Sequence, residues 1–350
     1  MHNVDMSLPL KDNPRHVAWL CEQLGLGRAG GALAPVSGGL HHRMWRLDTS
    51  KGSFAVKQLG LERELAHLDV AGHYNATEAA AAAFAAAGIP ALHALSSTDY
   101  LQQIDDEAYL VYPWTEARAV GRNRIPPEQA AQVAVLMAKM HRAGVDVPGL
   151  EQSRPNWLSS ERLAALLQGA MRHNLRDAEE LSVRSDLLLA IADGLGEARA
   201  ALAGNRLVSH GDLDHKNILW DEAGAPLVID WESTRWLNPT HELLLEALDW
   251  SGITAHFEIN PFRHFLEAYR GAGGIIDPAE VPAAFNCILG DWVTWLMYNL
   301  GRAMDVEDLS LHQLGSEQVD LALSTVLRIE HLLPRLRTVV DDVAGQREAV

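Results

Sequence analysis

The chain has 350 residues and a mass of 38.4 kDa, a length that favours two lobes or one large domain. Lys and Arg number 29 against 46 Asp and Glu, and the resulting net charge of -17 argues against nucleic acid and anionic membranes as partners. Cys21 and Cys287 are far apart and support neither a disulfide framework nor a metal knuckle. Because the sequence shows no signal peptide or membrane-spanning run, we expect a cytoplasmic protein.

The first 114 residues mix helix and strand signals. Asn13-Pro14 and Gly25 flank a predicted helix, with an Asn cap, Pro at the first helical position and Gly after the end. Alternating apolar residues and turn residues then predict two strands, a helix and a further strand, over residues 40–47, 54–59, 74–87 and 108–112. This order predicts a small α+β lobe.

The remaining residues are mainly helical in pattern. Residues 129–142 are the clearest amphipathic helix, and several more helices are expected over 157–203. A β-rich stretch interrupts them over residues 207–229, and helices then resume to the C-terminus. The pattern changes near Trp114 without a Gly/Ser tether, which favours a direct, hinge-like connection between two lobes.

The β-rich stretch carries polar residues just outside its strands. His210-Gly211-Asp212 is followed by Asn217, and a second apolar strand runs into Asp230. Phosphoryl transfer needs a carboxylate that orients and accepts the proton of a hydroxyl, together with oxygen ligands that hold Mg²⁺ on the phosphates. We therefore predict Asp212 as the base and Asn217 and Asp230 as metal ligands.

A lysine at the end of an apolar strand supplies a further part of such a site. Lys57 ends the run Phe54-Ala55-Val56-Lys57, as does the phosphate-binding lysine of protein kinases, which pairs with a helical glutamate. Glu78, which we expect to open the following helix, is the candidate partner, with Glu62 and Glu64 as alternatives. Ordinary structural roles compete: an edge-strand lysine for Lys57, and a helix N-terminal acid for Glu78.

These motifs, in this order, resemble the aminoglycoside phosphotransferase and choline kinase superfamily. The resemblance covers nearly the whole length, from Gly38-Gly39 to the segment Ile229-Asp230-Trp231-Glu232. It implies an α+β, bilobal, protein-kinase-like fold with a small antiparallel sheet and helix in the N-terminal lobe. The implied domains are a nucleotide-binding lobe over 1–114 and a mainly helical lobe over 115–350, with the catalytic loop at 207–232 and the substrate-binding region at 233–350.

The resemblance also implies roles for individual residues. The cofactors would be ATP or GTP and Mg²⁺. Asp212 would be the catalytic base, and Asn217 and Asp230 would hold the metal. The implied nucleotide contacts are Gly38 and Gly39 in a short hairpin over the phosphates, Lys57 on the phosphates with Glu78 beside it, and backbone around Tyr112 to Trp114 on the purine.

Three features depart from the family pattern. Position 214 is Asp where a basic or imidazole residue is common, which leaves His215 and Lys216 as candidate cations for the γ-phosphate. Glu242 stands where Asp is usual in the segment after the metal aspartate. No A-P-E-like segment follows Asp230, so the peptide-binding machinery of protein kinases is not expected. A small-molecule acceptor is implied.

Candidate acceptor residues lie after the metal aspartate. Helical spacing places five residues on one face, which is either core or an aromatic wall for the acceptor: Trp292, Trp295, Tyr298, Asn299 and Arg302. His215 and Glu232 are further candidates for substrate contact. Residues 230–310 hold thirteen acidic and four basic residues, a net charge of -9. We expect acids such as Asp249 and Asp291 to lie individually on solvated helix faces and collectively to disfavour an anionic acceptor.

The sequence therefore predicts an O-phosphotransferase for a small hydroxylated molecule. An aminoglycoside or another sugar-bearing or nucleoside antibiotic is the expected acceptor, in resistance or self-protection. A metabolic kinase of choline, aminosugar or homoserine type is the main alternative, and an inert kinase-like binding module is an alternative of another class. We expect a monomer or dimer.

Overall fold

The computed structural model describes residues 9–36, 42–60, 69–121, 125–151, 158–305 and 309–345. The chain forms two compact units. Unit 1 comprises Met1–Ala119, Val145–Glu151 and Asn217–Arg235, and unit 2 comprises Val120–Gly144, Gln152–Lys216 and Trp236–Val350. Each unit is built from several separate stretches of the chain. One of the points at which the chain passes between the units is the peptide bond from Lys216 to Asn217.

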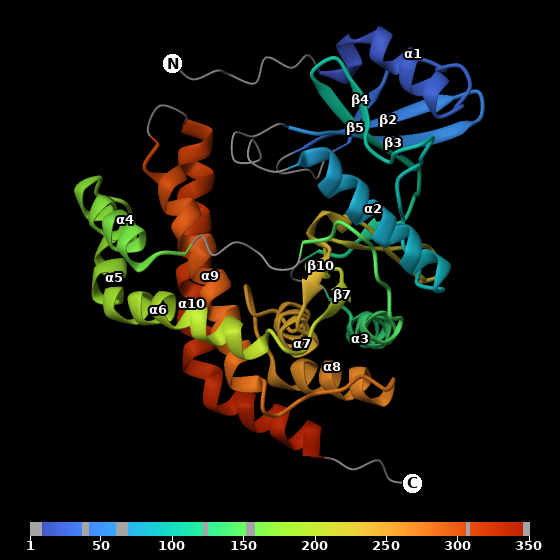
Figure 1. The fold of residues 1–350 in the computed structure, drawn as a ribbon. Helices are drawn as coiled ribbons and strands as arrows, with labels where there is room; N and C mark the ends of the chain where they lie inside the picture. The colour runs from blue at the N-terminus through green and yellow to red at the C-terminus, as the bar shows by residue number, and fades with distance from the viewer. Residues whose placement is uncertain are drawn as a thin grey trace. The chain divides into compact units, whose positions relative to one another are not determined.

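Unit 1 contains a five-stranded antiparallel sheet in the order β1-β2-β3-β5-β4 (Figure 1). The strands are β1 (Ala34–Val36), β2 (Arg43–Thr49), β3 (Gly52–Gln58), β4 (Gln102–Ile104) and β5 (Glu107–Pro113). The predicted strands over 54–59 and 108–112 are confirmed as β3 and β5. The first predicted strand, over 40–47, is β2 in its described part.

Helices cover both faces of this sheet because its side chains alternate between them (Figure 1). Tyr109 and Val111 of β5 face a core made with η1 (Leu10–Asp12) and α1 (Pro14–Gln23). Leu110 and Tyr112 face the opposite core, which includes Tyr74 of α2 (Val70–Ala86). Asn13 caps α1 as predicted, because its side chain accepts from the amide of His16.

A second, three-stranded sheet in unit 1 contains the hairpin that carries two predicted site residues. Its strands, in spatial order, are β6 (Arg118–Ala119), β8 (Ile218–Trp220) and β9 (Pro226–Val228). The turn between β8 and β9 is fixed by Asp221, whose side chain accepts from the amide of Ala225 at 2.8 Å. After β9 the chain enters the short helix η3 (Trp231–Ser233).

Unit 2 is mainly helical. Its helices are α3 (Pro127–Arg142), α4 (Ser160–Arg172), α5 (Ala178–Val183), α6 (Ser185–Leu202), α7 (Pro239–Asp249), α8 (Ile259–Gly271), α9 (Val281–Ala303) and α10 (Leu309–Gly345). Two short strands pair beside α7, β7 (Leu207–Ser209) and β10 (Arg235–Leu237), the latter beginning at the last residue of unit 1.

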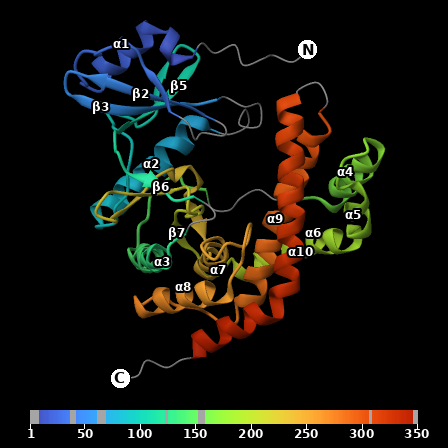
Figure 2. The same cartoon turned by 180° about the vertical axis from the view of Figure 1, so that it is seen from behind.

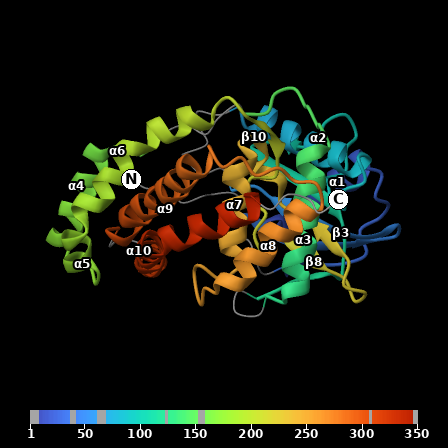
Figure 3. The same ribbon diagram turned by 90° about the horizontal axis from the view of Figure 1, so that it is seen from below.

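Two groupings of helices build the core of unit 2. Helices α9 and α10 run side by side (Figure 2), and they approach so closely that a Cβ on Gly315 would lie 2.5 Å from the backbone nitrogen of Ala303. Helix α7 contacts both α3 and α8 (Figure 3). The mixed α+β architecture predicted from the sequence is confirmed. Among the described residues, no helix is both long enough and apolar enough to span a membrane.

Candidate active site

Lys57 lies near the end of β3, and two carboxylates of unit 1 bind its ammonium. The side chain is only 9% exposed, and its Nζ lies 2.8 Å from Asp230 Oδ1 and 2.7 Å from Glu232 Oε2. Burial alone would lower the pKa of Lys57, but the two carboxylates outweigh it and raise that pKa. The lysine is therefore a permanently charged, held cation and not a solvated edge residue.

The β8–β9 hairpin brings Asn217 and Asp230 to one end of the same element. Ile218 pairs with Val228, and the carbonyl of Asn217 accepts from the amide of Ile229 at 3.0 Å. Asp230 follows directly with a left-handed backbone, at φ 62°, which is rare for a residue with a side chain. An amide and a carboxylate are oxygen donors of the kind that Mg²⁺ prefers, so the side chains present here fit the predicted ion.

Glu232, the second carboxylate that binds Lys57, also contacts two histidines. Its Oε2 lies 3.3 Å from Nε2 of His42, and its backbone carbonyl lies 3.0 Å from Nε2 of His73. The amide of Gly60 donates to Nδ1 of His42, which leaves the proton of that ring on Nε2, facing Glu232. Burial opposes ionisation of Glu232, but the His42 and Lys57 contacts outweigh it and lower its pKa. No motif in the sequence pointed to His42 or His73 as partners of Glu232.

Glu78 does not bind Lys57 in this structure, which differs from the predicted pairing. Its carboxylate is 2% exposed and accepts from the amide of Ala94 and the hydroxyl of Tyr112, both at 2.6 Å. Desolvation raises the pKa of Glu78, although these two hydrogen bonds oppose the shift. The helix also begins at Val70, capped by Asp69, so Glu78 lies well inside it and not at its start. A preference for the helix N-terminus therefore does not explain this glutamate.

The other predicted nucleotide contacts lie at the end of β5 or outside the described residues. Gly38 and Gly39 belong to the latter group, as do the alternative partners Glu62 and Glu64. Tyr112 pairs with Ala55 of β3, and the amide of Trp114 donates to the carbonyl of Ser53 at 3.1 Å. The sheet therefore already uses one backbone donor of the predicted purine-binding segment.

In unit 2, the loop that contains Asp212 is held by three carboxylates of α7. The amide of Gly211 donates to Glu242 at 2.7 Å, that of Leu213 to Glu246 at 2.8 Å, and that of His215 to Asp249 at 3.3 Å. Positions i, i+4 and i+7 share one face of a helix, and alternate residues share one side of an extended loop. The three carboxylates on one face of the helix therefore meet three alternate amides of the loop. These hydrogen bonds hold the backbone on both sides of Asp212.

The Asn238-Pro239 segment explains why α7 begins where it does. The Asn238 side chain accepts from the amide of His241 at 2.9 Å, and Pro239 occupies the first helical position. This cap sets the rotation of α7 that turns Glu242 toward the loop. The proline segment noted in the sequence is thus a helix start that orients a loop-binding carboxylate.

Glu242 is ionised and fully buried. His141 of α3 lies 2.6 Å from its Oε2, and the other ring nitrogen of that histidine lies 2.8 Å from the Tyr269 hydroxyl. Burial opposes ionisation, but the hydrogen bonds and charge of His141, with further bonds from Ser209 and Gly211, lower the pKa of Glu242 to about 2. Removing this carboxylate would leave the Gly211 amide and Nε2 of His141 without their buried acceptor.

Glu246 has the opposite electrostatic character. It is 2% exposed, and among the described residues its second carboxylate oxygen has no hydrogen-bond partner. Desolvation and the nearby charges of Asp249, Asp214 and Asp212 raise its pKa well above the usual range. Only the i, i+4, i+7 spacing of the acids in α7 could have signalled these loop contacts. The expectation that Asp249 lies on a solvated helix face is wrong.

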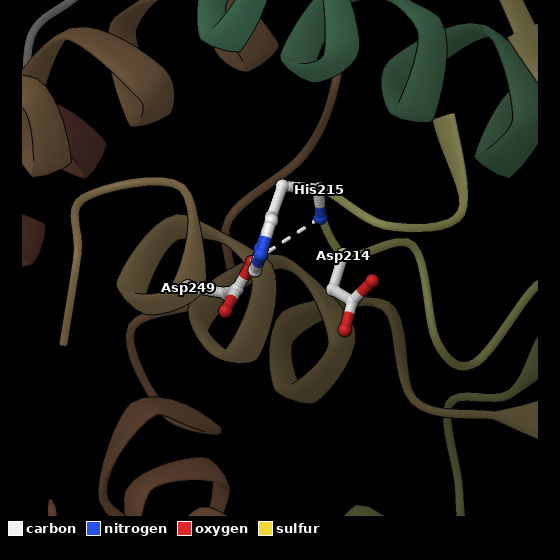
Figure 4. A group of neighbouring side chains, drawn as sticks. All are labelled: Asp214, His215 and Asp249. Carbon is white, nitrogen blue, oxygen red and sulfur yellow. Dashed lines mark hydrogen bonds and ion pairs between the residues drawn. The ribbon is translucent and has the colours of Figure 1, made fainter. Parts of the chain in front are cut away.

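Asp214 and His215 of the loop lie together with Asp249 at the end of α7 (Figure 4). The Nδ1 atom of His215 lies 2.9 Å from Asp249 Oδ2, and Asp214 forms an ion pair with Lys216. Three such side chains could in principle hold a cation, but both carboxylates here are already paired with cationic or histidine groups of the loop. His215 is therefore engaged by α7, and its predicted contact with the acceptor stays a prediction.

The predicted aromatic face of α9 is partly core and partly surface. Trp295 stacks on Tyr298, and the guanidinium of Arg302 lies 4.4 Å from the centre of the Tyr298 ring. Asn299 is fully buried and donates to the carbonyl of Trp295 at 2.9 Å. Trp292 is half-buried. Asn299 thus belongs to the packed side of the helix, whereas the aromatic residues keep part of their surface exposed.

Unit 1 thus holds a buried strand lysine and a hairpin with an asparagine and an aspartate, and unit 2 holds an anchored aspartate loop, which are groups of the kinds that a phosphotransferase uses. The family model described as "Phosphotransferase enzyme family" matches residues 32–284, so the chain belongs to this family. Its reaction class is therefore phosphoryl transfer. Comparison with curated protein sequences finds no match.

Solved structures share the fold at low sequence identity. A spectinomycin phosphotransferase, APH(9)-Ia, in complex with ADP and spectinomycin aligns with a TM-score of 0.63 and 13% identity, over 90% of this chain and 98% of its own. The amicoumacin kinase hAmiN, in complex with AMP-PNP and Ca²⁺, gives 0.61 and 15%, over 96% of each chain. A choline kinase from Cryptosporidium parvum gives 0.57 and 11%, over 95% of this chain and 100% of its own.

Proposed function

We propose that this enzyme transfers the γ-phosphoryl group of ATP or GTP to a hydroxyl group of a small molecule. The observation that carries the proposal is the ion pair between Nζ of the buried Lys57 and Asp230 Oδ1, at 2.8 Å. A held cation beside a carboxylate at the end of a hairpin suits the binding of a polyphosphate with its divalent metal. Two of the structurally similar proteins carry a nucleotide, ADP or AMP-PNP, which supports this choice of cofactor.

Each part of the site has a distinct task in this proposal. Asn217 and Asp230 hold Mg²⁺, and Lys57 binds the nucleotide phosphates. When bound, the metal draws negative charge from the phosphate oxygens. Asp212 aligns the acceptor hydroxyl and accepts its proton. Residues 1–114 bind the nucleotide, with the segment from Tyr112 to Trp114 on the purine, and residues 233–350 select the acceptor.

The acceptor that we propose is an aminoglycoside or another sugar-bearing or nucleoside antibiotic. Two of the similar structures are kinases named for antibiotics, spectinomycin and amicoumacin. Asp214 and Asp249 place two carboxylates around the loop, which favours a neutral or cationic molecule. A metabolic kinase of choline type is the competing assignment, supported by the likeness to a choline kinase, and choline is also a cation.

Nucleotide consumption with a panel of acceptors tests the proposal. ADP release from ATP or GTP would be measured with Mg²⁺ and with aminoglycosides, spectinomycin, nucleoside antibiotics, choline, ethanolamine and homoserine. We expect at least one compound to accelerate release, and mass spectrometry to show that this compound has gained a phosphoryl group. An Asp212→Asn variant should lose about 10²–10⁴-fold in kcat with that acceptor.

The same experiment separates the proposal from an inert binding module. A module of that kind would bind nucleotide without turnover, and Asp212→Asn would change nothing. If the Asp212→Asn variant keeps full activity with an accepted substrate, the assigned base is wrong even though the enzyme class stands.

A further inference from the structure

The ammonium of Lys216 lies among the carboxylates of the loop that carries the proposed base. It forms an ion pair with Asp214 Oδ2 and lies 3.7 Å from Asp212 Oδ2. The backbone amide of Lys216 also donates to Asp214 Oδ1 at 3.0 Å, so Asp214 binds both the backbone and the side chain of Lys216. The Lys216 side chain is 55% exposed and can therefore be reached by a ligand.

His215, the other cation considered for the γ-phosphate, is occupied elsewhere. Both its backbone amide and its Nδ1 bind the same oxygen of Asp249 on α7, at 3.3 Å and 2.9 Å. Figure 4 shows the His215 ring against Asp249, with the Asp214 carboxylate to one side of that pair. The geometry therefore separates the two candidates, because α7 binds His215 whereas the ammonium of Lys216 lies beside Asp212.

The position of the Lys216 ammonium is set by geometry. It lies between Asp214, with which it forms an ion pair, and the carboxylate of the proposed base, Asp212. A lysine held between these two carboxylates places its positive charge beside the group that the base would act on.

We propose that Lys216 is a catalytic residue whose ammonium contacts the γ-phosphoryl group, and that Asp214 is the positioning residue that holds it there. This inference rests on the proposed function, in which Asp212 lies at the hydroxyl that attacks phosphorus. A cation 3.7 Å from the base carboxylate is within reach of the oxygens of the group being attacked. The loop therefore still supplies a positive charge although position 214 is Asp. Lys216 carries that charge, and Asp214 binds its ammonium.

The step balances without covalent participation of Lys216. The acceptor oxygen forms a bond to the γ-phosphorus, and the bond from that phosphorus to the oxygen bridging to the β-phosphate breaks. The nucleoside diphosphate leaves with the electron pair, and the hydroxyl proton passes to Asp212. Lys216 keeps its protons throughout and offsets the charge on the transferring oxygens.

Nucleotide affinity tests this inference without knowledge of the acceptor. AMP-PNP and ADP would be titrated calorimetrically, each with Mg²⁺, into the full-length wild type and the variants Lys216→Met, Lys216→Arg and Asp214→Asn. Only AMP-PNP carries a γ-phosphate. We expect Lys216→Met to weaken AMP-PNP about tenfold more than ADP, Lys216→Arg to restore most of the difference, and Asp214→Asn to lie between.

Two controls make each result decisive. Lys139→Met removes an exposed lysine of α3 in the same unit and should leave the AMP-PNP to ADP affinity ratio unchanged. Thermal unfolding of each variant checks that it folds, and Lys216→Arg serves if Lys216→Met does not. If the AMP-PNP to ADP affinity ratio is unchanged in Lys216→Met while the wild type binds both nucleotides, the role of Lys216 is wrong and the proposed function is unaffected. A wild type that binds neither nucleotide contradicts the proposed function instead.

Discussion

Glu242 accepts a hydrogen bond from the backbone amide of Gly211 at 2.7 Å, across 31 residues of sequence and in a fully buried environment. Gly211 immediately precedes the proposed base, and its left-handed backbone, at φ 77°, suits glycine at this turn. The carboxylate is itself held by His141. The position of Asp212 thus depends on a charged group that never meets a substrate.

The free energy of unfolding should depend on pH in a way that reports the ionisation of Glu242. Its pKa is lowered to about 2 in the folded chain, from the usual glutamate value of 4.5. The folded state therefore binds fewer protons, so this stabilisation is present above pH 4.5 and is lost as the pH falls from 4.5 toward 2. A shift of this size corresponds to about 3 kcal/mol. Urea unfolding from pH 7 to pH 3 should show about 2 kcal/mol of this loss, because the rest follows below pH 3.

Glu242→Gln should remove most of that acid-side slope and lower the free energy of unfolding at pH 7 by about 3 kcal/mol. The matched control is Glu258→Gln, which changes an exposed acid of the same unit and should leave both quantities unchanged. Equal slopes for the two variants would contradict the assignment.

Glu246 should affect stability in the opposite direction. Because its folded pKa is raised, the folded state binds its proton more tightly, and this contribution to stability is lost as the pH rises above about 4.5. Glu246→Gln keeps an oxygen that can accept from the Leu213 amide and removes the titrating group. We expect the variant to be as stable as the wild type at pH 5 and about 1 kcal/mol more stable at pH 8. A clear loss of stability at pH 8 would show that the carboxylate is needed in its ionised form.

The partner of Lys57 can be measured by double-mutant cycles in the absence of nucleotide and metal. Pairing Lys57→Met with Glu232→Gln should give a coupling of about 1–3 kcal/mol in the free energy of unfolding, because the 2.7 Å ion pair is lost. Pairing it with Glu78→Gln should give less than about 0.5 kcal/mol, since Tyr112 and Ala94 hold that carboxylate. The reverse order of couplings would restore the pairing predicted from the sequence.

The two sides of α9 should respond differently to substitution. Asn299→Ala removes a fully buried amide and should lower the free energy of unfolding by about 1–2 kcal/mol with little change in the KM for the acceptor. Trp292→Ala, at a half-buried position, should raise that KM if the face binds the acceptor. Once an acceptor is known, steady-state kinetics with chemical denaturation separates the two effects. A rise in KM for Asn299→Ala alone would assign the buried side of α9 to the acceptor site.

Local signals in the sequence predicted the elements that carry the site. Helix α1 was predictable because Asn13, Pro14 and Gly25 act within a few residues of its ends. Strand β3 and the β8–β9 hairpin followed from apolar runs bounded by turn residues. The start of α2 was missed by four residues, because Asp69 caps a helix whose first turn is not strongly apolar.

Contacts distant in sequence were not predictable in this way. Lys57 lies 173 residues from Asp230 and 175 from Glu232, and no periodicity within β3 could select these partners over Glu78. The same holds for Glu246 and Asp249, whose acidic spacing on α7 is equally typical of a solvated helix face. Which face is buried depends on what packs against it.

The groups of the proposed site could be recognised from short spacings within single elements: an aspartate loop, an asparagine and an aspartate around a hairpin, and a strand lysine. What holds those groups became visible only in the folded chain. Much of the net charge of -9 in residues 230–310 is spread along helices, but three of its acids, Glu242, Glu246 and Asp249, hold the loop around Asp212. A buried carboxylate takes its role and its pKa from the donors packed around it, and packing brings those donors from distant parts of the chain.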